Sequence, residues 1–277
     1  MITVGPTFER AREAGRGLLI GYLPAGFPSY AGALDAFKAM VDAGVDAVEV
    51  GFPYSDPVMD GPTIQAAAER ALAAGLRTRD VLKTVEAVAA TGVPTLVMTY
   101  WNPVQRYGVA AFARDLAAAG GGGLITPDLI PDEAAGWIAA ADEHRLDKVF
   151  LVSPSSTDTR LAMTVEHCRG FVYATSVMGV TGARDQTSSR APELVARTRR
   201  FTDQPIGVGL GVSNGEQAAE VAAYADAVVV GSAFVRRLLD ADDASSGVES
   251  IARLTEDLVD GVRRTVRRRA GERSPAM

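Results

Sequence analysis

The chain has 277 residues, a net charge of −6 from 28 basic and 34 acidic side chains, and a hydrophobic content of 47%. This length fits one large domain or two smaller ones, and the composition excludes a largely disordered chain. The acidic balance argues against a dedicated nucleic-acid-binding protein, so we expect no nucleic-acid partner. No apolar run is long enough to span a bilayer, and we expect no membrane partner.

The single cysteine, Cys168, excludes an internal disulfide bond and fits a reducing compartment. Residues 1–19 lack the apolar segment of a secretory leader, so we expect a cytoplasmic location. The two histidines, His144 and His167, lack the spacing of metal ligands, and we expect no metal site.

Short apolar segments alternate with helical patterns along the chain, after a leading helix predicted over 8–16. Eight strands are predicted to begin near residues 18, 46, 95, 123, 148, 171, 206 and 227. Helical signals follow them in these segments: from Ser29, which caps the helix, to Gly44; 62–74; 78–91; around Val109, Phe112 and Leu116; 131–143; 157–168; from about 192; from a capping box at Ser213 to Glu216; after Ser232; and a last helix with Ile251, Leu254, Leu258, Val262 and Val266 on one face. The segment Trp101-Asn-Pro is predicted as a loop.

Strands that alternate with helices imply parallel pairing, and continuous apolar strands imply burial on both faces. The predicted fold class is therefore α/β: a single-domain (β/α)8 TIM barrel over 1–268, with an extra N-terminal helix and a flexible basic tail at 269–277. An open doubly wound sheet is the alternative, but the first strand–helix turn lacks the Gly-x-Gly-x-x-Gly phosphate fingerprint.

Two carboxylates belong to the second strand and the loop that leaves it. Glu49 lies within the apolar strand, and Asp60 lies in the following loop, before Pro62 begins a helix. A buried acid is either paired in a structural network, protonated or catalytic. Because barrel active sites lie at the carboxyl ends of the strands, both acids are candidates for proton chemistry. We expect Glu49, the more buried of the two, to be the easier to protonate.

Glycines at the last two strand ends point to phosphate binding. Gly209 and Gly211 follow the seventh strand, and Gly231 and Ser232 follow the eighth, where a short helix begins. Backbone N–H groups at such a helix start attract an anion, although tight turns alone also favour glycine. The polar loop at 179–189 is either a lid that closes over substrate or an ordinary surface loop.

Residues 48–65 (VEVGFPYSDPVMDGPTIQ) closely resemble the signature of the tryptophan synthase alpha chain family. The resemblance covers nearly the whole chain except the basic tail and continues through 100–103, 127–131, 153–158, 179–182, 209–213 and 230–232. It implies a carbon–carbon lyase of tryptophan biosynthesis that cleaves indole-3-glycerol phosphate to indole and glyceraldehyde 3-phosphate. Three positions depart from residues common in the family: Tyr22 and Leu210, where many members have Phe, and Pro24, where many have Thr.

The resemblance also implies residue roles. Glu49 would shuttle the proton at indole C3, Asp60 would interact with the indole N–H, and Tyr173 would orient the site. The indole pocket would be formed by Tyr22, Tyr100, Ile125 and Leu210. The phosphate would be bound by Gly182, Gly211, Gly231 and Ser232, beside Thr181 of the mobile loop.

A beta chain is the partner that the resemblance implies, in an alpha2-beta2 tetramer, with Asp56, Asn102 and Pro103 at the interface. The beta chain would carry pyridoxal phosphate, and this chain would need no cofactor. Two other functions stay open: a stand-alone indole-releasing lyase, and a catalytically idle barrel kept as an allosteric subunit.

Overall fold

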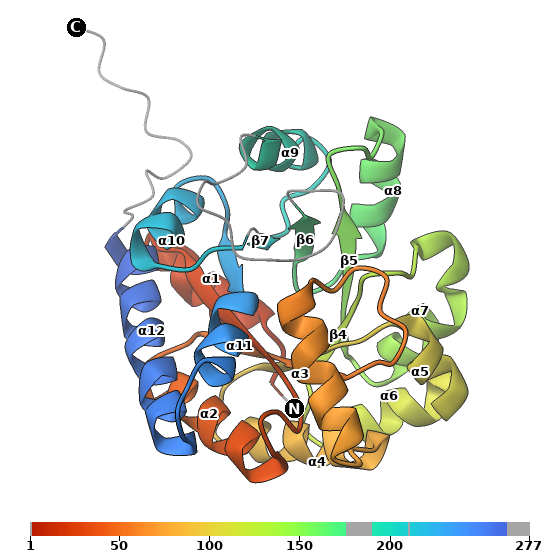
Figure 1. Ribbon diagram of the computed structural model, residues 1–277. Coiled ribbons are helices and arrows are strands. Elements are labelled where there is room, and N and C mark those ends of the chain that lie inside the picture. Colours follow the sequence, from red (N-terminus) through yellow and green to blue (C-terminus); the bar gives the residue numbers. More distant parts are fainter. Residues whose placement is uncertain (1, 176–189, 210, 265–277) are drawn as a thin grey trace, which may run out of the picture.

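The computed structural model describes residues 2–175, 190–209 and 211–264, and Figure 1 shows their arrangement. Eight parallel strands pair in chain order and close into a barrel, because β1 pairs with both β2 and β8. The strands are β1 (Leu18–Pro24), β2 (Ala47–Gly51), β3 (Thr95–Met98), β4 (Gly123–Thr126), β5 (Asp147–Val152), β6 (Val172–Thr175), β7 (Ile206–Gly209) and β8 (Ala227–Val230). Each begins within one residue of its predicted position, so the predicted barrel is confirmed.

Helices surround the barrel and connect its strands. They are α1 (Gly5–Glu13), α2 (Tyr30–Asp42), α3 (Pro62–Ala73), α4 (Thr78–Ala89), α5 (Trp101–Tyr107), α6 (Val109–Ala118), the 3-10 helix η1 (Pro131–Glu133), α7 (Ala135–Glu143), α8 (Asp158–His167), α9 (Arg190–Thr198), α10 (Gly215–Ala222), α11 (Ser232–Leu239) and α12 (Ala244–Arg264). Each described helix is too short or too polar to cross a bilayer. The predicted tail at 269–277 lies outside the described residues.

Three helix predictions are corrected. The leading helix was predicted over 8–16 but ends at Glu13, since Gly15 takes a φ of 68° and stops it. The segment 131–143 is broken at Ala134 into η1 and α7. The predicted loop at Trp101 is the start of α5.

Helix caps are predicted correctly in one case and wrongly in another. The Ser29 hydroxyl accepts a hydrogen bond from the Gly32 N–H, as expected for the N-cap of α2. The Ser213 capping box is wrong, because Asn214 caps α10 by accepting from the Gln217 N–H. Ser213 instead donates to the Gln217 side chain.

The core has two layers that follow from the alternation of side chains along each strand. One cluster fills the barrel and includes Ile20, Ala47 and Leu96, whereas Val48 and Val50 belong to the cluster between strands and helices. The leading helix α1 contributes to the inner cluster, where Phe8 packs on Phe171 with ring centroids 5.7 Å apart. The opposite end of the barrel, where the strands end, carries the candidate site.

Candidate active site at the carboxyl ends of the strands

Glu49 points into the barrel from β2. Its neighbours Val48 and Val50 pack outward and Ala47 packs inward, so residue 49 lies on the inner face. The side chain is fully buried, and within the described residues neither carboxylate oxygen has a hydrogen-bond partner. Burial raises the pKa of Glu49 to about 8. The described part of the chain therefore contains no ion pair with Glu49, which was one of the alternatives left open by the sequence. With this pKa, the Glu49 carboxyl group is mostly protonated at neutral pH.

Asp60 is held by residues from two elements. The Tyr100 hydroxyl, after β3, accepts hydrogen bonds from the Met59 and Asp60 N–H groups at 3.0 and 3.2 Å and donates to Asp60 Oδ1 at 3.1 Å. Gln65 of α3 donates through Nε2 to the Asp60 carbonyl at 2.7 Å. Burial raises the pKa of Asp60, and the hydrogen bond from Tyr100 opposes that rise. Asp60 is consequently easier to ionise than Glu49.

Tyr22 links the two acids electrostatically. It lies opposite Glu49 in the β1–β2 register and packs against residues of the core. Burial raises the pKa of Tyr22 well above its usual value, and the charges of Asp60 and Glu49 raise it further. The pKa of Tyr173 is raised by burial and then by Glu49. Both carboxyl groups therefore lie near one phenol ring, at the same mouth of the barrel.

Each of these tyrosines lies against a glycine on the next strand. A Cβ atom on Gly51 would lie 2.3 Å from the Tyr22 hydroxyl, and one on Gly209 would lie 2.3 Å from the Tyr173 hydroxyl. Each glycine follows the register partner of its tyrosine by two residues. Glycine at these two positions thus makes room for the rings of Tyr22 and Tyr173, which we call the aromatic wall.

The candidate phosphate residues lie at the ends of β7 and β8, which are paired. Gly211 takes a φ of 73°, in the region that favours glycine. Gly231 is the N-cap of α11, and the buried Ser232 is the first residue of that helix. The backbone N–H groups of the first turn of α11, which have no partner within the helix, therefore lie beside Gly231. A Cβ on Gly231 would lie 3.0 Å from Tyr22 Cδ1, which places this helix start next to the aromatic wall.

Of the remaining predicted residues, one lies in the barrel core and three lie outside the described part of the chain. Ile125 is fully buried in the inner cluster, opposite Met98 in the β3–β4 register. Thr181, Gly182 and Leu210 lie outside the described residues, as does the loop at 179–189.

The predicted interface residues lie on the loop of Asp60 and on helix α5. Asp56 and Asn102 are exposed and Pro103 is half-buried. Asn102 Nδ2 donates to the Tyr54 hydroxyl at 3.0 Å, and the Tyr54 ring lies 5.3 Å from the ring of Tyr100. The interface candidates and the Tyr100–Asp60 pair are therefore connected through one aromatic contact.

Sequence reasoning placed Asp128 among the residues at the strand ends, but it did not predict the contacts that Gln65 and Asp128 make in this site. Gln65 holds the Asp60 backbone, and the Asp128 carboxylate accepts from the Trp101 N–H at 2.9 Å, at the start of α5. The only sequence signal for Asp128 was its position after a strand end. In the described chain, no group of three or more His, Cys, Asp or Glu side chains is arranged to hold a metal ion.

These observations define the class of protein: a (β/α)8-barrel enzyme with two carboxylates and a candidate phosphate site at the carboxyl ends of its strands. A family model described as tryptophan synthase alpha chain matches residues 8–263. The chain belongs to the tryptophan synthase alpha chain family. It is a carbon–carbon lyase, and the reaction of this subunit cleaves indole-3-glycerol phosphate to indole and glyceraldehyde 3-phosphate.

Individual relatives agree with this assignment. The tryptophan synthase alpha chain of Salinispora arenicola is 62% identical over 95% of this chain and 98% of that protein. A structure of Mycobacterium tuberculosis tryptophan synthase matches with a TM-score of 0.88 and 58% identity, over 94% of this chain and 98% of that one. The alpha subunit from Legionella pneumophila matches with a TM-score of 0.84 at 30% identity, over 95% and 99%.

Proposed function

We propose that Glu49 and Asp60 divide the proton chemistry of the cleavage. The observation that carries this proposal is the buried Glu49 carboxyl group, which has no hydrogen-bond partner in the described chain and a pKa of about 8. Such an acid is protonated when substrate binds, and it has a proton to donate to indole C3. Asp60, which ionises more readily, accepts a hydrogen bond from the indole N–H and stabilises the positive charge that develops on the ring.

Cleavage of the bond between indole C3 and the side chain follows from this protonation. Protonation at C3 converts the indole into an indolenine cation, an electron sink next to the glycerol phosphate side chain. The hydroxyl on the adjacent carbon loses its proton, a C=O bond forms, the C–C bond to C3 breaks, and its electron pair restores the aromatic ring. Glu49, now a carboxylate, is the base that we assign to the hydroxyl proton. Tyr173 orients the site, and the charge of Glu49 raises the pKa of its phenol beyond the effect of burial.

The remaining residues bind the two ends of the substrate. The phosphate binds at the N-terminus of α11, which Gly231 and Ser232 form, and also contacts Gly211 after β7 and Gly182. Tyr22, Tyr100, Ile125 and Leu210 surround the indole. The proposal is supported by the closeness of Gly231 to Tyr22, since a Cβ added at Gly231 would lie 3.0 Å from Tyr22 Cδ1.

We further propose that a beta chain docks on the face formed by Asp56, Asn102 and Pro103, in an alpha2-beta2 tetramer in the cytoplasm. Val58, on the loop that carries Asp56 and Asp60, is 73% exposed, so it offers apolar area to a partner at this face. The beta chain carries pyridoxal phosphate and receives indole, and this chain carries no cofactor of its own.

The test is indole release from indole-3-glycerol phosphate, measured with and without the beta chain, for the wild-type protein and Glu49→Gln. We expect slow release by the chain alone, stimulation by the beta chain, and none above background in Glu49→Gln. Strong release that the beta chain leaves unchanged would identify a stand-alone lyase. No release by the wild type in either condition would identify an idle barrel.

A further inference from the structure

A side-chain contact joins the helix of the phosphate site to the helix that follows Asp60. Arg236 lies one turn after Ser232 on α11, and its Nη2 donates to Thr63 Oγ1 at 3.3 Å. Thr63 is the second residue of α3, three positions after Asp60, and its side chain is 9% exposed. The two helices pack against each other, and they lie side by side in Figure 1. The contact therefore spans 173 residues of sequence to connect the two halves of the proposed site.

The start of α3 in turn holds Asp60. Gln65, two residues after Thr63, bonds the Asp60 carbonyl at 2.7 Å. Tyr100 fixes the same residue from the β3 side. A shift of α3 relative to α11 would thus move the Asp60 carbonyl against the Tyr100 hydroxyl, and misplacement of a catalytic group by a fraction of an ångström is costly.

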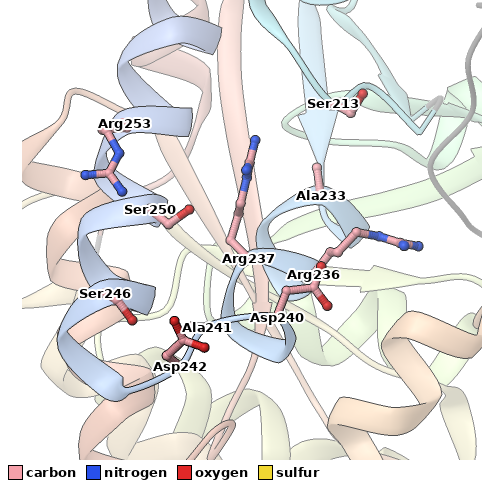
Figure 2. A pocket seen from close by; sticks show the side chains of 10 residues that line it. All are labelled: Ser213, Ala233, Arg236, Arg237, Asp240, Ala241, Asp242, Ser246, Ser250 and Arg253. Atoms are coloured by element: carbon pink, nitrogen blue, oxygen red, sulfur yellow. The ribbon is translucent and has the colours of Figure 1, made fainter.

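The neighbouring arginine provides a matched comparison. Arg236 and Arg237 are both exposed and both line a pocket of about 450 Å³ between α11 and α12. In Figure 2 the Arg236 side chain extends away from α12, whereas Arg237 rises between Ser250 and Ser213. Within the described chain Arg237 makes no hydrogen bond or ion pair, so the two residues share their charge and helix but differ in contact.

Helix electrostatics alone do not favour the contact. A cation beside the N-terminus of α3 is opposed by the helix dipole, so the bond to Thr63 offsets an unfavourable placement. Arg236 could also act directly, because its guanidinium adds positive potential near a bound phosphate. This direct electrostatic effect would not require the hydrogen bond to Thr63. Removing the Thr63 hydroxyl while keeping the Arg236 charge separates the two explanations.

We propose that Arg236 is a positioning residue, which through Thr63 couples phosphate binding at the start of α11 to the placement of Asp60. This inference rests on the proposed function, because it takes the phosphate to bind at Ser232 and Asp60 to hold the indole N–H. The coupling acts on the chemical step more than on affinity, since Arg236 lies one turn beyond Ser232 and bonds Thr63 of α3.

The first test compares Arg236→Leu, Arg236→Lys and Thr63→Val with the control Arg237→Leu, in the full-length chain with its beta chain. We expect kcat to fall roughly threefold to tenfold in Arg236→Leu and in Thr63→Val, as for loss of one typical intramolecular hydrogen bond. The double variant should lose no more than either single one, Arg236→Lys should recover part of the rate, and the control should stay within about twofold. The Kd for glycerol 3-phosphate should change less than about twofold. Equal losses in Arg236→Leu and the control, or wild-type kcat in Thr63→Val, would overturn the inference.

The second test follows amide hydrogen exchange with and without glycerol 3-phosphate. In the wild type we expect protection of peptides covering 231–235 and also of peptides covering 60–67, and in Thr63→Val protection of 231–235 alone. Equal protection of 60–67 in the wild type and in Thr63→Val would overturn the coupling but would not contradict the proposed phosphate site. Absence of protection at 231–235 in the wild type would overturn the phosphate assignment and the inference with it.

Discussion

The Tyr100 hydroxyl makes three hydrogen bonds to the Met59–Asp60 segment: two as acceptor from backbone N–H groups and one as donor to Asp60 Oδ1 at 3.1 Å. One side chain, two residues after the end of the third strand, therefore fixes both the backbone and the carboxylate of the second acid. This pair explains how a residue on a loop is held in a defined position.

Tyr100→Phe should lower kcat about tenfold, because two N–H groups lose their acceptor and the Asp60 carboxylate loses a donor. The hydrogen bond from Tyr100 lowers the pKa of Asp60, so the variant should raise that pKa. The acid limb of the kcat/KM profile should then move to higher pH, since Asp60 is needed as a carboxylate. An acid limb that stays in place while kcat falls would contradict this reading and indicate a loss of packing alone.

Glu49→Gln should stabilise the fold. The pKa of Glu49 is raised from its usual 4.5 to about 8. Between these values the native state keeps a proton that the unfolded state has released, so the free energy of unfolding falls as pH rises from about 4.5 to 8. Glutamine removes that loss, and we expect a gain on the order of 3 kcal/mol at pH 7. Urea unfolding at pH 5, 7 and 9 should show a difference that grows with pH; a difference independent of pH would contradict the burial of an ionisable group.

Gly51→Ala should impair cleavage without unfolding the barrel, since the new Cβ would lie 2.3 Å from the Tyr22 hydroxyl and would displace the ring. We expect kcat/KM to fall at least about tenfold. Gly136→Ala is the matched control, because nothing lies within 4 Å of that Cβ on α7. It should keep full activity and gain about 0.5–1 kcal/mol in stability. Normal activity in Gly51→Ala would show that the position of Tyr22 is unimportant.

Gly231→Asp should weaken substrate binding, because its carboxylate would sit at the helix start proposed to bind phosphate and its Cβ would press on Tyr22. We expect KM for indole-3-glycerol phosphate and the Ki of glycerol 3-phosphate to rise together, by about tenfold or more. Gly5→Asp at the start of α1, where nothing lies within 4 Å, should leave both unchanged. An unaltered KM in Gly231→Asp would remove the phosphate assignment at this helix.

The fold was predictable because the eight buried strands are short apolar segments separated by helical patterns, and that alternation permits few topologies. The start of α5 was predicted as a loop for a physical reason. Its first N–H group is bonded by Asp128, which is 27 residues away, so no local capping signal was present. Ser213 and Asn214 are both residue types that favour the N-cap position. The sequence pattern predicted Ser213 as the N-cap of α10, but Asn214 takes that position.

The site was predictable only in part. Glu49 could be placed inside the barrel from the alternation of strand residues alone. The hydrogen bond between Tyr100 and Asp60 joins positions 40 residues apart. It depends on how the end of β3 packs against the loop after β2, which no local sequence pattern specifies. The same holds for Arg236 and Thr63, whose contact depends on the packing of α11 on α3. Contacts of this kind follow from closing the barrel and not from any local motif.

The central claim, that Glu49 is the acid that protonates indole C3, is tested most directly by the pH dependence of kcat/KM for indole-3-glycerol phosphate. Loss of the Glu49 proton should remove activity, so we predict that kcat/KM falls as pH rises through about 8, with one proton released. A rate that stays constant up to pH 10, with the protein still folded, would contradict the account.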